Sequence, residues 1–338
     1  MMGADLKQTL GVLVAGGIVF ALAPSFIELH TLTVLTIYGL LALSQGLIWG
    51  FGGILCFGQA AFFGLGAYAY AIAAINIGES TVPFLLGIAV PFLFALVFGA
   101  MLFFGRLSDV YLGVITLVVT LIFFKFMNST AGPQYVIGAA PLGGFNGIPA
   151  FPVLNIPGDP EAFIGGIGYY GICVAAILLT YALIRWLLAS PFGRIAVAIR
   201  ENETRAELMG YDIRLRKTLL FAIGGAIAGL AGTLFASWAE IVTPNMFSLT
   251  QSAEIIIWCI VGGRSTLVGP IIGAMALSYL KFLLGQQSLV DNMLILGLIL
   301  MLTVLLLPRG IVPTLAQGIT QVAARLRRRR IGEAQHGR

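Results

Sequence analysis

The amino-acid sequence predicts an all-α integral membrane protein with about ten transmembrane helices and both termini in the cytoplasm. Three observations support this fold class. The 338 residues are 59% hydrophobic and only 10% charged, whereas soluble globular chains carry roughly 25% charged residues. The apolar residues form runs of about 20, the length at which a helix spans a bilayer core. Lys and Arg also gather on alternate connections between these runs, as the positive-inside rule requires.

The apolar runs define the expected spans. Helices are the expected conformation because hydrocarbon cannot satisfy exposed backbone polar groups. The runs are too long and too uniformly apolar for the alternating strands of a barrel. The ten runs cover residues 8–27, 31–49, 54–76, 82–104, 110–127, 163–187, 218–238, 246–262, 267–284 and 291–307.

The first run has some features of a secretory signal peptide. It follows Lys7, and near its end stands the small-residue triplet Ala21-Leu22-Ala23, which is typical of a cleavage site. Pro24 directly follows this triplet, and we expect a proline there to block cleavage. We therefore interpret residues 8–27 as a retained transmembrane span.

Basic residues determine the expected orientation. With the N-terminus inside, every Lys and Arg falls on the cytoplasmic side except Lys125 and Lys281. These two lie close to the outer ends of their spans, where a lysine can extend its ammonium group to the membrane surface. We therefore expect a transmembrane domain over residues 1–312 and a basic cytoplasmic tail over 313–338. The consecutive arginines of that tail would contact anionic lipid.

One connection is long, contains no Lys or Arg, and is expected on the outer face. Residues 128–162 are rich in glycine and proline, which predicts turns rather than helix. A 35-residue connection without hydrophobic periodicity is longer than most loops, and such loops are more often functional than mere connectors. We expect this outer loop to bind a partner.

The inner connection, residues 190–217, is the longest polar segment between spans. Ser190 followed by proline is a favourable helix start, and Gly210 is placed to end the helix. Ile195, Ile199, Ala206 and Met209 then fall on one face of a single amphipathic helix, with Asn202 as its polar interruption. Glu201 and Arg205 form a favourable pair four residues apart. From the residues alone, a solvated loop and a docking element are both consistent with this pattern.

Two glycine clusters stand at inner-side turns. The first cluster, around the start of the third run, consists of Gly50, Gly52, Gly53 and Gly58, and the second, around the junction of the eighth and ninth runs, of Gly262, Gly263, Gly269 and Gly273. Glycines at these positions permit either close helix packing or local breaks in the helices, and broken helices line the translocation path of other transporters. We include Gln59, in the third run, among the candidate path residues.

Glu254 is the acidic residue placed inside a predicted span, four residues before Trp258. Ionisable groups in spans usually mark an ion pathway or a structural pair. Glu254 is therefore expected either to pair with a polar group near the outer face or to act in a gate. No series of Asp, Glu and His crosses the spans, which argues against a proton- or sodium-coupled carrier.

Residues for catalysis or metal binding are scarce. The two histidines, His30 and His336, lie far apart, and the three cysteines lie in separate apolar runs without a CxxC pair. The sequence also lacks the G-x-x-x-x-G-K-[ST] motif that cradles nucleotide phosphates. We therefore expect a non-enzymatic protein without a metal site, and any ATPase must be another polypeptide. The basic residues sit between spans rather than on one patch, so no nucleic acid is expected as a partner.

Four segments resemble permeases of bacterial ABC importers of the branched-chain amino acid (LivH/LivM) group, and most closely the LivM-type subunits. The inner segment is GRIAVAIRENETRAELMGYDIRLRKTLLFAIGGAIAGLAGTLFA. The others are GLIWGFGGILCFGQAAFFGLGAYAYAI, GGFNGI in the outer loop, and SAEIIIWCIVGGRSTLVGPIIGA. The resemblance covers residues 30–312 in order, and it leaves the first span and the tail unassigned.

The resemblance implies a multi-pass subunit of a heteromeric importer in the bacterial cytoplasmic (inner) membrane. Its expected partners are a second, LivH-like permease, two cytoplasmic ATPase subunits that bind ATP and magnesium, an extracytoplasmic solute-binding protein and membrane lipid. No cofactor is then expected in this chain.

The resemblance also implies roles for individual residues. The helix from Ala198 to Gly210 would couple the permease to the ATPases, and the matching positions are Ala198, Arg200, Ala206 and Gly210, with Glu201 and Arg205 on the same element. The GGFNGI motif would contribute to docking on the outer face through Gly143, Gly144, Asn146 and Gly147.

The expected substrates are branched-chain or other hydrophobic amino acids. Urea or short-chain amides are the alternative, because Trp258 and the GGRST turn are more similar to permeases of that type, whereas GGFNGI lacks the paired Asn of the urea type. The rival classes are a stand-alone channel or facilitator and a membrane-embedded enzyme.

Overall fold

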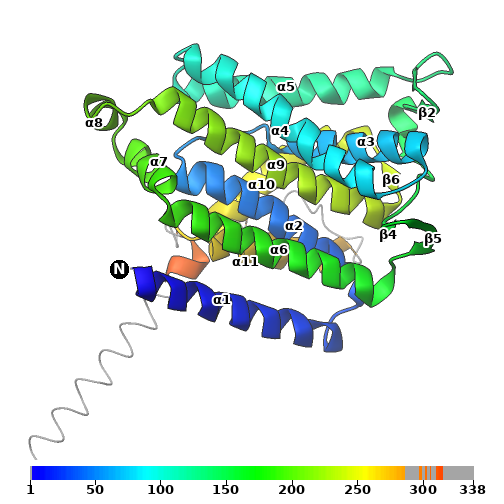
Figure 1. Ribbon diagram of the computed structural model, residues 1–338, viewed down its shortest axis with the longest axis horizontal. Helices are drawn as coiled ribbons and strands as arrows, with labels where there is room; N and C mark the ends of the chain where they lie inside the picture. Colours follow the sequence, from blue (N-terminus) through cyan, green and yellow to red (C-terminus); the bar gives the residue numbers. More distant parts are fainter. Residues whose placement is uncertain (1, 286–296, 299–300, 303–304, 306–309, 315–338) are drawn as a thin grey trace, which may run out of the picture.

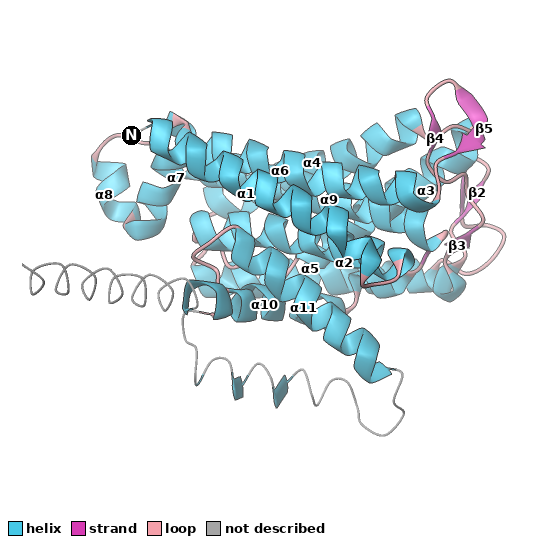
Figure 2. Ribbon diagram, turned by 90° about the horizontal axis from the view of Figure 1, so that it is seen from below, coloured by secondary structure: helices cyan, strands magenta, loops and turns pink. Residues whose placement is uncertain are grey.

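Long helices packed side by side make up most of the protein (Figure 1). The structure is a computed structural model, and it describes residues 2–285, 297–298, 301–302, 305 and 310–314. The long helices run between two ends of the molecule: α7 and α8 lie at one end, and the short strands lie at the other (Figures 1 and 2). The bounds of the α-helices are α1 Met2–Leu22, α2 Leu29–Gln45, α3 Gln59–Ile77, α4 Thr81–Phe104, α5 Asp109–Ser129, α6 Gly166–Ala189, α7 Pro191–Glu201, α8 Glu203–Leu208, α9 Ile213–Ala239, α10 Leu249–Gly262 and α11 Val268–Gly285.

Nine of the ten predicted runs coincide with a helix in the described part of the chain. Seven of the described helices are long and apolar enough to cross a membrane, while α1 and α10 provide shorter apolar segments. The chain is thus an all-α multi-pass membrane protein. The tenth run, 291–307, lies largely outside the described residues, as does the basic tail after residue 314. The count of ten spans stays a prediction.

Helix α2 lies at the centre of the bundle. It packs against α6, α9, α10 and α11, and its side chains are almost all buried. The outer helices differ, since α4, α5 and α6 expose large apolar side chains such as Val97, Ile122 and Leu183. In a membrane these exposed apolar faces would contact lipid, whereas in water they would be unfavourable.

Helices α3 and α9 cross at very short range. A Cβ atom added to Gly66 of α3 would lie 2.6 Å from the Cα atom of Gly229 in α9. One turn along, Gly232 of α9 faces the backbone of Phe63 with equally little space. Small residues permit this backbone approach, which is the usual basis of helix association in membranes.

The start of the third helix differs from the prediction. Residues Gly46–Phe51 continue α2 as a π-helix, and the amide of Gly52 bonds to the carbonyl oxygen of Leu47, five residues earlier. Gly53 then adopts a left-handed backbone with φ +71°. The chain therefore leaves the helix for several residues, and α3 begins at Gln59 rather than at residue 54.

The connection between α5 and α6 forms short strand pairs and turns. Strand β1 (Val136–Ile137) pairs with β2 (Ala140–Pro141), and β4 (Asn155–Ile156) pairs with β5 (Asp159–Phe163). Strand β3 (Ile148–Pro149) pairs instead with β6 (Ile241–Val242), which directly follows α9. The loop is thereby attached to the α9–α10 connection.

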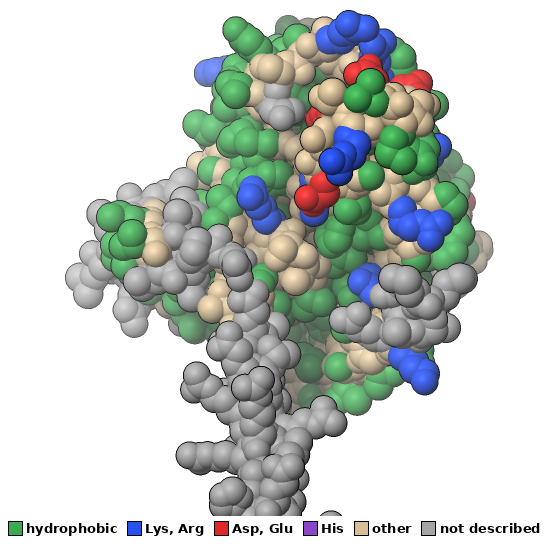
Figure 3. Space-filling model, turned by 90° about the vertical axis from the view of Figure 1, so that its left-hand side faces the viewer, with side chains coloured by type: hydrophobic (Ala, Val, Ile, Leu, Met, Phe, Trp, Pro, Cys, Tyr) green, Lys and Arg blue, Asp and Glu red, His purple; other side chains and the backbone are tan. Residues whose placement is uncertain are grey.

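The two long connections lie at opposite ends of the bundle. The start of α1 lies at the same end as α7 and α8, and strands β1 to β6 lie at the other end (Figures 1 and 2). Figure 3 looks onto the α7–α8 end and shows Lys, Arg, Asp and Glu side chains gathered there. Basic side chains at this end are what the positive-inside pattern predicts for the inner side of a membrane protein.

Candidate coupling site

The inner connection forms two short helices rather than one. Helix α7 begins after Ser190, whose side-chain oxygen accepts a hydrogen bond from the amide of Gly193. Helix α7 ends at Glu201, because Asn202 leaves the helical region with φ −161° and ψ 104°. The side-chain oxygen of Asn202 then accepts a hydrogen bond from the amide of Arg205 at 2.8 Å and caps α8. The prediction of one continuous helix was wrong because a capping asparagine satisfies the first turn of a new helix.

Gly210 ends the second helix, as predicted. It has φ +85°, and its amide bonds to the carbonyl oxygen of Glu207 at 2.9 Å. The amide of Tyr211 bonds back to Ala206 at 3.3 Å. This pair of bonds is the Schellman arrangement, which needs a left-handed residue where glycine is favoured. The chain is thereby turned towards α9.

The break at Asn202 also changes which residues face the bundle. Gly193, Ala196 and Ile199 are the buried residues of α7, and they pack it against α6, α9 and the π-helical segment. Met209, which was predicted to share this apolar face, is 67% exposed. The predicted stripe was therefore wrong at Met209, whereas Ala206 is buried as predicted, in a second helix with another direction.

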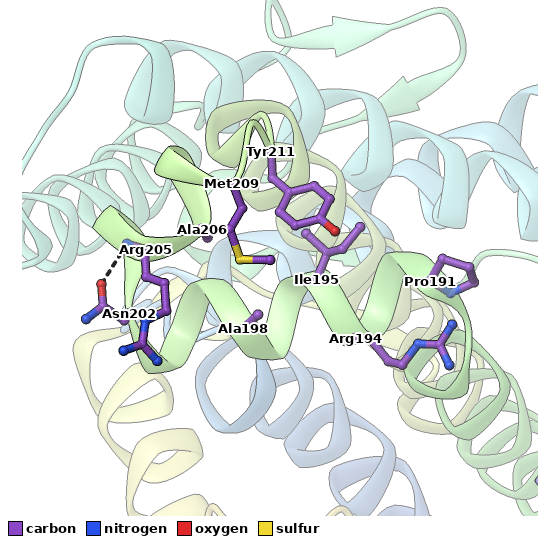
Figure 4. A pocket seen from close by; sticks show the side chains of 9 residues that line it. All are labelled: Pro191, Arg194, Ile195, Ala198, Asn202, Arg205, Ala206, Met209 and Tyr211. Carbon is purple, nitrogen blue, oxygen red and sulfur yellow. Dashed lines mark hydrogen bonds between the residues drawn. The ribbon is translucent and has the colours of Figure 1, made fainter. Parts of the chain in front are cut away.

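A pocket of about 280 Å³ lies between α7 and α8 (Figure 4). Met209 and Tyr211 point towards α7, where Ile195 and Ala198 line the floor. Its lining residues are Pro191, Arg194, Ile195, Ala198, Asn202, Arg205, Ala206, Met209 and Tyr211. The side chains that failed to form one stripe thus form the walls of an apolar hollow with arginines at its rim.

Arg200 connects α7 to the break after α2. Its Nη1 atom donates a hydrogen bond to the carbonyl oxygen of Gly50 at 2.5 Å, and Nη2 donates to the carboxylate of Glu201. The predicted Glu201–Arg205 pair is not formed, because the helix breaks between these residues. Gly53 leaves room for the arginine, since a Cβ atom there would lie 2.8 Å from Arg200 Cγ.

The two glycine clusters meet beside this contact. An added Cβ on Gly50 would collide with the carbonyl oxygen of Arg264, and one on Gly46 would lie 2.8 Å from Cγ of Pro270. The guanidinium of Arg264 lies 5.3 Å from the centre of the Trp49 ring, a distance typical of a cation–π contact. The break after α2 and the break between α10 and α11 are therefore packed together, with α7 attached to them through Arg200.

The second glycine cluster joins α10 to α11. Gly262 faces the backbone of Gly269 without space for a side chain, and Gly263 adopts φ +105° in the turn between the helices. Sequence reasoning located both clusters but could not detect that they touch, because more than 200 residues separate them.

Gln59 lies in a buried polar cluster of the core. Its Nε2 atom donates to Ser44 Oγ at 2.8 Å and to the carbonyl oxygen of Gly224 at 3.3 Å. The Oε1 atoms of both Gln59 and Gln45 have no hydrogen-bond partner among the described residues. Gln59 therefore joins α2, α3 and α9, and its side chain is not open to solvent in this structure.

Glu254 forms an ion pair with Lys281 across α10 and α11. The Nζ atom of Lys281 lies 2.5 Å from Oε1 of Glu254, and the side chains are 43% and 7% exposed, respectively. Pairing was one of the two roles predicted for Glu254. Its partner was missed, because the positive-inside pattern indicated only that Lys281 extends outward.

We expect Lys281→Met to destabilise the protein by about 1–3 kcal/mol. Breaking a fully buried ion pair costs about 3–5 kcal/mol, and the partial exposure of Lys281 lowers that cost. Adding Glu254→Gln should recover most of the loss, because no unpaired buried charge is then left. Thermal unfolding of both variants in detergent measures the stability. If the double variant regains stability but not transport, Glu254 acts in gating as well as pairing.

The GGFNGI turn is held against the neighbouring backbone at the opposite end. Gly143, Gly144 and Gly147 all have positive φ values between 54° and 72°, a region that favours glycine. Gly147 approaches the carbonyl oxygen of Val242 too closely for a side chain. Asn146 is exposed at the tip of this turn, where it is accessible to a partner.

Comparison with known proteins identifies the family. A profile of the family described as "Branched-chain amino acid transport system / permease component" matches residues 27–307. The chain belongs to this family.

Curated relatives agree with the family assignment. The LivM permease of the high-affinity branched-chain amino acid transport system of Escherichia coli is 28% identical over 87% of this chain and 71% of its own length. A probable LivM of Methanocaldococcus jannaschii is 26% identical over 73% of this chain and 78% of its own. The ribose import permease RbsC of Bacillus subtilis is 31% identical, over 42% of this chain and 47% of its own. No solved structure matches significantly. Like the LivM proteins, the chain is thus a permease component of a transport system.

Proposed function

We propose that this permease imports branched-chain or other hydrophobic amino acids as one subunit of an ATP-driven ABC importer in the bacterial cytoplasmic membrane. The observation that carries the proposal is the α7–α8 pair: an exposed apolar pocket, attached by Arg200 to the place where two interrupted helices meet. The family profile and the LivM relatives, which cover most of the chain, support the substrate class.

The α7–α8 end faces the cytoplasm in this proposal. The N-terminus lies at the same end, and basic side chains gather there, as expected for the inner side of a membrane. Two cytoplasmic ATPase subunits bind ATP and magnesium, and this chain binds neither. A LivH-like second permease completes the membrane part. A solute-binding protein docks on the outer end, where Asn146 and the strand pairs lie.

Motion passes from the ATPases to the membrane helices through α7. A partner side chain held in the α7–α8 pocket moves both short helices when the ATPases close. Arg200 transmits the displacement to Gly50, and the packed glycine breaks distribute it to α3 on one side and to α10 and α11 on the other. Conformations open to the outside and to the inside then alternate, because nucleotide and loaded binding protein favour different states.

Uptake into vesicles that contain the whole assembly tests this function. We expect accumulation of labelled leucine, isoleucine or valine that requires ATP and the binding protein, and little uptake of urea. Uptake of urea or acetamide in preference to leucine would show that the substrates are urea or short-chain amides, the alternative that the similarity around Trp258 indicates. Passive flux through vesicles that contain this chain alone would contradict the proposal and indicate a channel.

A further inference from the structure

A second hollow lies at the α7–α8 end, on the other side of α8. Its volume is about 260 Å³, and three parts of the chain line it. The end of α4 and the following turn contribute Phe103, Arg106 and Leu107; α8 contributes Glu203 and Glu207; the start of α9 contributes Ile213, Arg214 and Lys217. Five of these eight side chains are charged, which differs from the apolar pocket between α7 and α8.

Part of this charge is neutralised within the hollow. Lys217 forms an ion pair with Glu203, and its Nζ atom lies 6.0 Å from the centre of the Phe103 ring. In contrast, the guanidinium groups of Arg106 and Arg214 and the carboxylate of Glu207 have no hydrogen bond or ion pair with any residue that the structure describes. The hollow therefore offers two cationic groups and one anionic group to a ligand.

The backbone at Arg106 supports a function for this side chain. Arg106 has φ +53°, a conformation that glycine adopts freely and other residues adopt at a cost. Residues held in such conformations cluster at ligand sites. Here an arginine occupies such a position, in the turn after α4, although its guanidinium has no partner among the described residues.

The hollow adjoins an exposed apolar surface. Met101, Phe104, Val110 and Tyr111, on the ends of α4 and α5 beside the hollow, are 50–76% exposed. An apolar surface with arginine and tyrosine at its edge is typical of the membrane–water interface. Acyl chains along α4 and α5 would place their headgroups at Arg106, and basic hollows between helices on the cytoplasmic side bind lipid headgroups.

We propose that this hollow binds the headgroup of a phospholipid that carries an amine, such as phosphatidylethanolamine. The phosphate accepts hydrogen bonds from Arg106 and Arg214, since the guanidinium fork matches phosphate oxygens. The ammonium group pairs with Glu207. The lipid then joins the α4–α5 turn to α8 and α9, and it stabilises the position of the α7–α8 pair.

Native mass spectrometry of the full chain in its assembly tests the proposal, with phosphatidylethanolamine, phosphatidylglycerol and phosphatidylcholine of equal chain length. We expect at least about tenfold tighter binding of phosphatidylethanolamine to the wild type than to Arg106→Gln/Arg214→Gln. The matched control, Lys7→Gln/Lys125→Gln, removes two charges away from the hollow and should bind like the wild type. Equal affinity in wild type and Arg106→Gln/Arg214→Gln overturns the proposal.

Two further variants separate the parts of the site. Arg106→Gly suits φ +53°, so it should fold at least as well as the wild type and still lose lipid affinity; retained affinity contradicts the role of Arg106. Glu207→Gln should remove the preference for phosphatidylethanolamine over phosphatidylglycerol, and an unchanged preference overturns the pairing with the amine. O-phosphoethanolamine without acyl chains should not compete at the lipid concentrations used. Equal competition would instead indicate a site for a soluble phosphate.

Discussion

Arg200→Glu should assemble normally in the membrane and lose substrate-stimulated ATP hydrolysis. The wild-type arginine donates a charge-assisted hydrogen bond to the Gly50 carbonyl oxygen, and such bonds contribute about 1.5–3 kcal/mol. A glutamate cannot donate, and its charge faces a carbonyl oxygen and the neighbouring Glu201. The contact between α7 and the break after α2 is thereby lost, so ATPase motion no longer reaches the membrane helices.

The measurement is ATP hydrolysis by the purified assembly with and without loaded binding protein. The variant should hydrolyse ATP at the basal rate under both conditions. Glu201→Gln is the matched control: it removes the adjacent carboxylate and leaves the Arg200–Gly50 bond, so it should keep most of the stimulation. Normal stimulation in an intact Arg200→Glu assembly would remove Arg200 from the coupling path.

Gly66→Ala should be among the most destabilising single-methyl changes in the bundle. The new Cβ would lie 2.6 Å from the Gly229 Cα atom and even closer to its carbonyl oxygen. These are backbone atoms of α9, so no side chain can rotate away, and α3 and α9 must separate. Overpacking typically costs about 1–3 kcal/mol, and we expect the upper end of this range.

Thermal unfolding of the purified protein measures this effect, and each kcal/mol corresponds to about 2–4 °C for a large domain. Gly171→Ala is the matched control, because Gly171 lies inside α6 with nothing within 4 Å of its added Cβ. That variant should be unchanged or more stable, since alanine favours helix by about 1 kcal/mol over glycine. Equal unfolding temperatures of the two variants would contradict the close α3–α9 crossing.

Local sequence signals predicted the features that depend on neighbouring residues. Apolar runs located nine of the described helices, α1 to α6 and α9 to α11. They could do so because the bilayer imposes a similar length and composition on every span. Ser190 and Gly210 marked the start and end of the inner segment, since a cap and a left-handed turn need only the adjacent backbone. The positions of Lys and Arg predicted which connections lie at each end of the bundle.

The same local reasoning failed where two local solutions competed. The sequence of residues 191–210 is compatible with a single amphipathic helix, and it is equally compatible with two helices joined at Asn202. A capped second helix exchanges one hydrophobic stripe for a pocket, and it still buries Ala206. Residue spacing alone does not distinguish these two solutions.

The sequence by itself determined that this protein is a multi-pass permease component with a polar segment at one end. Only the tertiary structure decided what that segment contacts. Arg200 and Gly50 are 150 residues apart, and Glu254 and Lys281 belong to different helices. Such pairs arise when helices pack, because packing brings donors and charges together regardless of their order in the chain. The link between the α7–α8 pair and the glycine breaks is a property of that packing.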